Sequence, residues 1–195
     1  MSKMRGRRFG VICILAALWG CFFLYLSDAR AGEANSTQYV MGGYFVYGNA
    51  HDKDADYDFV SINPYFGWLL TPADRMFTVE FAVEGFYNRH LFEFDNKYEV
   101  GVRPILRFHY LYGHRISPFF EVSTAGVLYT NLKVRETGSD LNFTSHVGAG
   151  FDVRLWDEWY LNMAYRYRHI SNAGLDEDNG GINHHQGLMG LSYHF

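Results

Sequence analysis

His169 and Ser171 have the residue types and the spacing that covalent ester chemistry needs. Residues two apart on an extended strand lie on the same face, so this imidazole could act as general base for the serine hydroxyl. Such a base needs a third group, usually a carboxylate, that orients its ring. The pattern is short and the chain has nine histidines, so a polar surface patch is the alternative interpretation.

The positions of the cysteines and of the acidic residues limit which thiol and metal sites the chain can form. Cys13 and Cys21 both lie in an N-terminal apolar segment, so the rest of the chain has no thiol for a disulfide, a nucleophile or a metal site. Four aspartates at alternate positions within residues 52–58 are a weak candidate for binding a divalent cation, and a solvated loop is the more common reason for such a run. We therefore expect no catalytic metal and no cofactor.

The N-terminus has the three parts of a secretory signal. Four basic residues precede an apolar run from Val11 to Leu26, and Ala29-Arg30-Ala31 supplies a small-x-small cleavage pattern. An anchoring helix is the alternative, because the run is close to the minimum length for spanning a membrane. We expect residues 1–31 to be a cleaved signal peptide and residues 32–195 to form one domain.

The mature chain would be acidic and rich in aromatic residues. Removal of residues 1–31 leaves 12 basic and 20 acidic residues, so the formal net charge falls from −4 to −8. We expect no binding to nucleic acid, since neutralisation of phosphates dominates that affinity. An aromatic content of 18% with 20 glycines suits strands with aromatic girdles better than helices.

Alternation with a period of two recurs through residues 32–195, and no segment there keeps a helical period. Strands are predicted at residues 37–48, 57–70, 76–88, 97–112, 117–130, 141–155, 159–172 and 183–195. Connections after the second, fourth and sixth strands are short, whereas the others are longer and polar, which is typical of outer-membrane barrels. The predicted fold is all-β, an eight-stranded antiparallel transmembrane β-barrel of the bacterial outer membrane, with both termini on the periplasmic side.

The C-terminal residues support this prediction. Leu191, Tyr193 and Phe195 alternate with polar residues, and the chain ends on an aromatic ring. This ending resembles the terminal signature by which the outer-membrane assembly machinery recognises its substrates, so we expect that machinery as a partner through Phe195. The alternative is a soluble lipocalin-like barrel, whose apolar residues would face inward.

Eight strands enclose a space that side chains can fill, so we expect a packed interior rather than a pore. Charged residues within otherwise alternating strands are the candidates for filling it, as matched ion pairs. They are Glu80, Glu84, Glu121, Arg103, Arg107, Arg154, Arg166 and Arg168.

Counting back from the C-terminus by twos places the outward-facing residues at the loop end of the last hairpin. His185 and Asn183 share the lipid-facing side of the last strand, and His169 and Ser171 share that side of the strand before it. A symmetric hairpin centred near Glu177 would set Ser171 opposite Asn183 and His169 opposite His185. The candidate pair then lies at the lipid-facing rim on the extracellular side.

The run Arg168-His169-Ile170-Ser171-Asn172-Ala173-Gly174-Leu175, followed by Asn179-Gly180-Gly181-Ile182-Asn183, resembles the lipid A 3-O-deacylase family (PagL). The resemblance is dense over residues 165–195 and looser through residues 138–150 and the eight-strand plan. It implies an outer-membrane serine esterase that removes the 3-O-linked acyl chain from lipid A of lipopolysaccharide, with Ser171 as nucleophile and His169 as general base.

The same resemblance assigns the surrounding residues. Asn172 and Asn179 match positions that shape the site, and Ala173 and Gly174 match residues whose backbone N–H groups form an oxyanion hole. An ordinary loop rich in Asn and Gly is the alternative interpretation of these four residues.

Asn183 departs from the family pattern, because it stands where the family has the glutamate of the triad. An amide oxygen can accept the Nδ1–H of His169, but it cannot stabilise an imidazolium by charge. The acidic residues 176–178 or His185 are the candidates for replacing that charge.

Two other functions are open from the sequence. One is a non-catalytic small barrel that acts as an adhesin or stabilises the membrane. The other is a different lipid-modifying barrel, such as an acyltransferase or a phospholipase. The expected partner is lipid A or lipopolysaccharide of the outer leaflet, a homodimer is an open alternative to a monomer, and the acyl-chain preference does not follow from the sequence.

Overall fold

The computed structural model describes residues 38–52, 55–73, 75–91, 96–132, 139–175 and 180–195, which form eight strands. The predicted signal peptide, residues 1–31, lies outside these ranges and stays a prediction. None of the residues described belongs to a helix long and apolar enough to cross a membrane. The strands are β1 (Tyr39–Asp52), β2 (Ala55–Leu69), β3 (Phe77–His90), β4 (Tyr98–Tyr110), β5 (Ile116–Thr130), β6 (Leu141–Trp156), β7 (Trp159–Ser171) and β8 (Ile182–His194).

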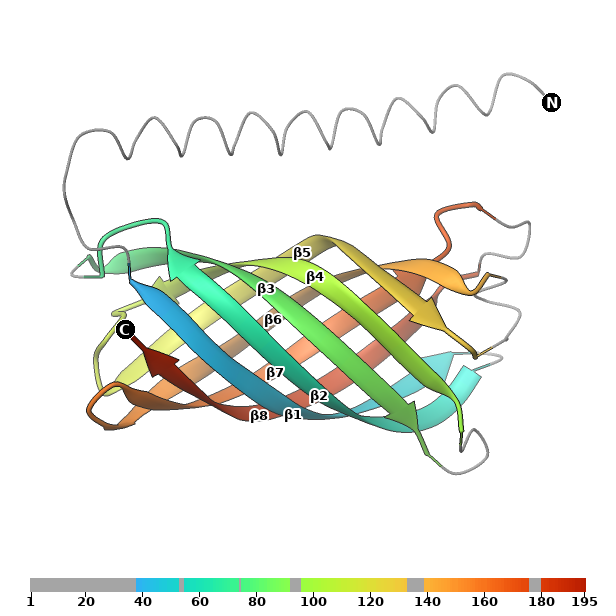
Figure 1. Ribbon diagram of the computed structural model, residues 1–195, viewed down its shortest axis with the longest axis horizontal. Helices are drawn as coiled ribbons and strands as arrows, with labels where there is room; N and C mark the ends of the chain where they lie inside the picture. The colour runs from blue at the N-terminus through green and yellow to red at the C-terminus, as the bar shows by residue number, and fades with distance from the viewer. Residues whose placement is uncertain (1–37, 53–54, 74, 92–95, 133–138, 176–179) are drawn as a thin grey trace, which may run out of the picture. The chain divides into compact units, whose positions relative to one another are not determined.

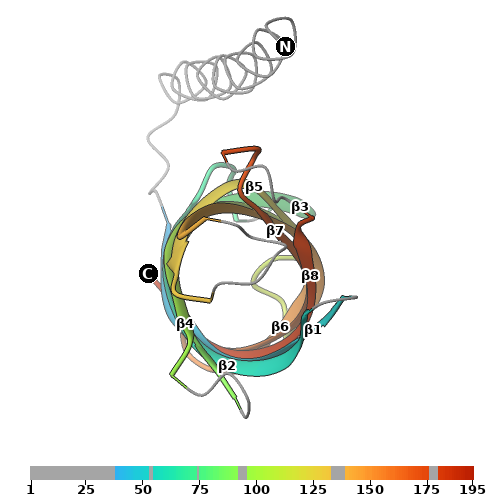
Figure 2. The ribbon, with the colours of Figure 1, turned by 90° about the vertical axis from the view of Figure 1, so that its right-hand side faces the viewer.

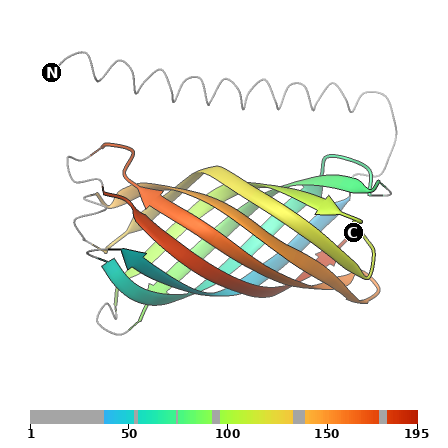
Figure 3. The same ribbon diagram turned by 180° about the vertical axis from the view of Figure 1, so that it is seen from behind.

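The strands form a closed antiparallel barrel. Each strand pairs with the next, and β1 pairs with β8, so the ladder has no free edge (Figures 1 and 2). The turns after β2, β4 and β6 lie at the same end of the barrel as the C-terminus, and the β7–β8 connection lies at the opposite end (Figures 1 and 3). This architecture confirms the predicted eight-stranded antiparallel β-barrel.

The prediction that the first two strands are joined by a long polar loop is wrong. Residues 49–56 were expected to leave the sheet because they are polar, but the β1–β2 ladder continues through Asn49↔Asp58 to Asp52↔Ala55. Backbone hydrogen bonds do not depend on side-chain polarity, so a ladder can extend beyond the apolar belt. No group of His, Cys, Asp or Glu in the described ranges is arranged to hold a metal ion.

The two faces of the barrel wall differ in polarity. Phe45 and Met189 point outward and are 59% and 58% exposed, whereas Glu84 and Arg166 point inward and are 0% exposed. This is the apolar-out, polar-in alternation of membrane barrels. The soluble, lipocalin-like interpretation is therefore wrong.

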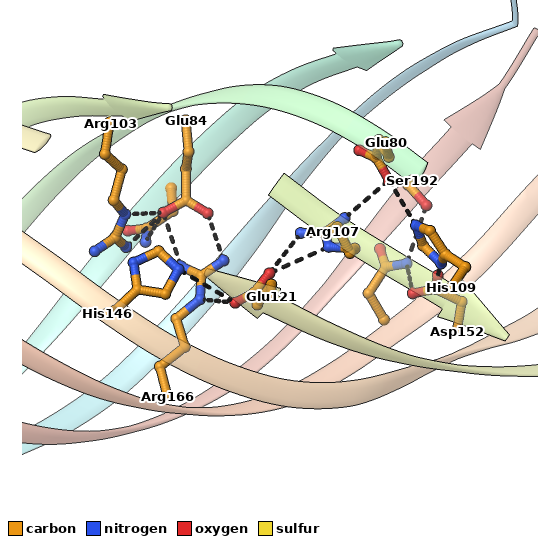
Figure 4. Close-up of polar contacts among 12 residues, drawn as sticks. Glu80, Glu84, Arg103, Arg107, His109, Glu121, His146, Asp152, Arg166 and Ser192 are labelled. Carbon is orange, nitrogen blue, oxygen red and sulfur yellow. Dashed lines mark hydrogen bonds and ion pairs between the residues drawn. The ribbon is translucent and has the colours of Figure 1, made fainter. Parts of the chain in front are cut away.

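Ion pairs fill the middle of the lumen, as predicted (Figure 4). Arg166 donates hydrogen bonds to Glu84, at 2.8 Å, and to Glu121. Arg103 also donates to Glu84, and Arg107 donates to Glu121 at 3.0 Å. Because every one of these groups is buried, the pairing offsets a desolvation penalty of several kcal/mol per ion. The centre of the barrel is thus filled by a network of paired charges.

Arg154 was predicted to fill the lumen, but it lies at the open end of the barrel beside Tyr160 and is not buried. Its partner across the β6–β7 ladder is the buried Tyr160, so alternation still places Arg154 on the inner face, but the ladder ends close by and leaves the side chain open to solvent. The Arg154 side chain is exposed, and it lies 3.7 Å from the carboxylate of Glu158.

Candidate active site

Strand β7 presents His169 and Ser171 together on its outer face. Both are partly buried, whereas the intervening Ile170 and the preceding Arg168 are buried on the inner face. Ser171 is the last residue of β7 and pairs with Phe143 of β6. The predicted sharing of one face is confirmed.

The register of the β7–β8 hairpin differs from the prediction. His169 lies opposite Asn183, and Tyr167 lies opposite His185, so the hairpin is centred at residue 176. An assumed loop centre does not determine register, because the pairing of the strands depends on the backbone conformation of the loop, in which Ala173, Gly174 and Gly181 are left-handed. The observed register brings Asn183 against the imidazole.

A hydrogen bond of 2.9 Å joins His169 Nδ1 to Asn183 Oδ1. An amide oxygen can only accept, so Nδ1 carries the proton and Nε2 is left as the basic nitrogen. Within the described part of the chain no hydrogen bond joins Ser171 to His169. Such contacts are often long without substrate and shorten when it binds.

The chain turns sharply directly after Ser171. Ala173 and Gly174 both have left-handed backbone, with φ of 53° and 80°. The buried Asn172 stabilises the turn, because its Oδ1 accepts a hydrogen bond of 2.8 Å from the Gly174 N–H. The Gly174 N–H is therefore already engaged. Asn179, the other residue expected to shape the site, lies outside the described residues, as do the acidic residues 176–178.

The two strands that carry the site are tied to the rest of the barrel from inside. Arg168, next to His169, donates a hydrogen bond of 2.9 Å to Glu99 of β4. His184, next to Asn183, is hydrogen-bonded to Tyr57 of β2 at 2.8 Å. Sequence reasoning missed Glu99, His184 and Tyr57, although the parity of each strand places them on the inner face. These contacts limit movement of His169 relative to Asn183.

An apolar groove of about 590 Å³ lies on the outer face of β7 and β8 and of their neighbours β6 and β1. Tyr165 is part of its wall and shares the outer face of β7 with His169, four residues away, or about 13 Å along the strand. Between the groove and the site, the Tyr165 hydroxyl is hydrogen-bonded to His185 Nδ1. The groove is lined by large residues and four small ones: Phe45, Tyr47, Phe151, Met163, Tyr165, Leu188, Met189, Ala149, Gly150, Ala164 and Gly187.

The model of the lipid A 3-O-deacylase (PagL) family matches residues 54–192. The chain belongs to this family. The match begins next to β2 and ends within β8, so it contains His169, Ser171 and Asn183. It confirms the resemblance predicted from the β7–β8 segment.

Two solved barrels show the same fold. The crystal structure of the outer membrane enzyme PagL is 21% identical, with a TM-score of 0.57, and the alignment covers 79% of this chain and 98% of that one. Neisserial surface protein A (NspA) is 14% identical, with a TM-score of 0.61 and coverages of 83% and 100%. The comparison with curated proteins gave no match. This PagL-family chain is an outer-membrane β-barrel protein, as predicted.

Proposed function

We propose that this chain is a lipid A 3-O-deacylase, a serine esterase that removes the 3-O-linked acyl chain from lipid A of lipopolysaccharide. The observation that carries the proposal is the His169–Asn183 hydrogen bond beside Ser171, on the outer face at the loop end of a PagL-family barrel. At that place an ester of an outer-leaflet lipid can reach the site without leaving the membrane.

In the proposed reaction Ser171 is the nucleophile and His169 the general base. His169 Nε2 takes the hydroxyl proton as Ser171 Oγ attacks the ester carbonyl carbon. The tetrahedral intermediate collapses, and its sugar oxygen leaves with the proton from His169. Water, deprotonated by His169, then attacks the acyl-enzyme, and the fatty acid is released as Ser171 regains its proton.

We assign the oxyanion contact to the Ala173 N–H, since the Gly174 N–H donates to Asn172. A backbone donor of this kind contributes about 3–4 kcal/mol to stabilising the transition state. Asn172 then acts on the site through the shape of the turn, and Asn179 remains a predicted contributor.

Asn183 takes the orienting place in the triad. It keeps the proton of His169 on Nδ1, which is the tautomer that the mechanism requires. It offers no negative charge to the imidazolium, so we expect slower turnover than a carboxylate would support.

The outer groove is where we place the acyl chain. Its lining is almost wholly apolar, and it lies on the periplasmic side of the ester position along β7. An acyl chain that leaves an outer-leaflet ester runs in this direction, toward the bilayer midplane. Recognition of Phe195 by the assembly machinery and the oligomeric state remain predictions.

The test uses the purified barrel and lipid A in detergent micelles, with released fatty acid identified by mass spectrometry. We expect release of one 3-hydroxy fatty acid by the wild type and none by Ser171→Ala or His169→Gln. Thr124→Ala, an exposed hydroxyl deletion on β5, is the control and should keep full activity. A folded wild-type barrel that releases nothing would favour a non-catalytic barrel. Release from glycerophospholipid alone would favour a phospholipase.

A further inference from the structure

The His169 ring is contacted on two edges, and only one of these contacts is a hydrogen bond. Asn183 holds Nδ1 at 2.9 Å. On the other edge lies Gly181, a buried residue directly before β8. A Cβ atom built on Gly181 would lie 2.5 Å from His169 Cε1 and 3.0 Å from Nε2. The backbone of Gly181 therefore rests against the edge that carries the basic nitrogen.

We propose that Gly181 is a positioning residue for His169, an inference that rests on the proposed function. A hydrogen bond at Nδ1 holds one point of the ring and leaves rotation about that point. Contact with Gly181 at Cε1 blocks rotation of the ring toward the backbone that precedes β8. Gly181, directly before β8, thus holds the imidazole by packing, and Asn183, near the start of β8, holds it by its amide.

Because Asn183 carries no charge, packing against Gly181 matters for the orientation of His169. A neutral amide holds an imidazole less strongly than a carboxylate does, because hydrogen bonds to a charged partner are about twice as strong as neutral ones. Steric contact from Gly181 supplies orientation that does not depend on charge. Only glycine fits, since any Cβ would overlap the ring and the backbone there is left-handed, with φ of +75°.

Gly113 provides a matched control. Its φ is +76°, and a Cβ built on it meets nothing within 4 Å. It lies in the β4–β5 turn, at the opposite end of the barrel from the β7–β8 loop (Figure 1). Gly113→Ala therefore introduces the same left-handed alanine as Gly181→Ala but places no atom against His169.

The first readout is the kinetics of ester hydrolysis by the folded barrel. We expect Gly181→Ala to lower kcat by a factor on the order of 10², the effect of misplacing a catalytic group by about 1 Å. KM should change by less than about threefold, because substrate contacts are kept. Gly113→Ala should keep the wild-type kcat. Equal losses in both variants would mean that backbone strain, not contact with His169, is responsible, and would overturn the proposal.

The second readout does not need activity. In ¹⁵N-histidine-labelled barrel, the His169 signals are assigned by their disappearance in His169→Gln. We expect a protonated Nδ1 and a bare Nε2 in the wild type and in Gly113→Ala, and altered ¹⁵N shifts of both nitrogens in Gly181→Ala. If the wild type hydrolyses no lipid A, the proposed function fails while this spectrum still tests the positioning. Unchanged His169 signals in Gly181→Ala would overturn the positioning role.

Discussion

Substitution of Asn183 tests how His169 is oriented. The side chain of Asn183 is partly buried and accepts the His169 Nδ1–H at 2.9 Å. Asn183→Asp keeps the length of the side chain and places a negative charge at the same position. Asn183→Ala removes the acceptor altogether.

The expected effects follow from the environment of that hydrogen bond. Unit charges 4 Å apart attract by about 4 kcal/mol near a protein surface and by about 1 kcal/mol in bulk water. A partly exposed pair falls toward the lower value, so we expect about 1–2 kcal/mol of added stabilisation of the imidazolium. Since 1.4 kcal/mol is a factor of ten, Asn183→Asp should raise kcat roughly tenfold. Asn183→Ala loses a neutral hydrogen bond worth about 1 kcal/mol, so kcat should fall at least roughly fivefold.

The assay is kcat for release of fatty acid from lipid A in micelles by the wild type and both variants, at one neutral pH. The predicted order is Asn183→Asp, then wild type, then Asn183→Ala. If Asn183→Asp loses activity as Asn183→Ala does, the amide nitrogen makes a contact that the aspartate cannot replace. If all three rates agree, Asn183 does not orient His169, and the mechanism proposed above is wrong.

Three further predictions concern the groove, the lumen and the C-terminus. Gly187→Leu should fill the groove and reduce hydrolysis of long-chain esters in the micelle assay, because the Cβ position of Gly187 is open. Gly85→Leu, whose Cβ position on β3 is similarly open, should leave the rate unchanged in the same assay. Arg166→Met leaves buried carboxylates short of a partner and should lower the free energy of unfolding in urea by about 3–5 kcal/mol; Arg154→Ala, which breaks an exposed pair, should lower it by less than about 1 kcal/mol. Phe195→Ala should reduce the amount of folded barrel in the outer membrane of cells while refolding in detergent stays unchanged; equal yields in cells would contradict recognition of that residue.

Much of the fold could be predicted because a closed barrel wall permits only one simple pattern. Outward residues must face lipid and inward residues must fill the lumen, so alternation alone placed His169 and Ser171 together on the outer face. The same alternation correctly assigned Glu84 and Arg166 to the interior, where burial required them to pair.

The remaining features depend on local geometry that alternation does not contain. The register that sets Asn183 opposite His169 depends on the backbone conformation of the loop, which includes the left-handed Ala173. The exposure of Arg154 depends on how close it lies to the end of the β6–β7 ladder, which alternation does not give. The contact between Gly181 and the imidazole joins residues on two strands, and the sequence shows only a glycine in a loop.

Deacylation of lipid A by Ser171 can be measured on lipid A taken from living cells. Cells that produce the wild type or Ser171→Ala are compared by mass spectrometry of extracted lipid A, with equal amounts of folded barrel confirmed in the outer membrane. We predict the loss of one 3-hydroxyacyl group in cells with the wild type and intact lipid A in cells with Ser171→Ala. The same deacylated lipid A with both proteins, or intact lipid A with both, would show that Ser171 does not deacylate lipid A.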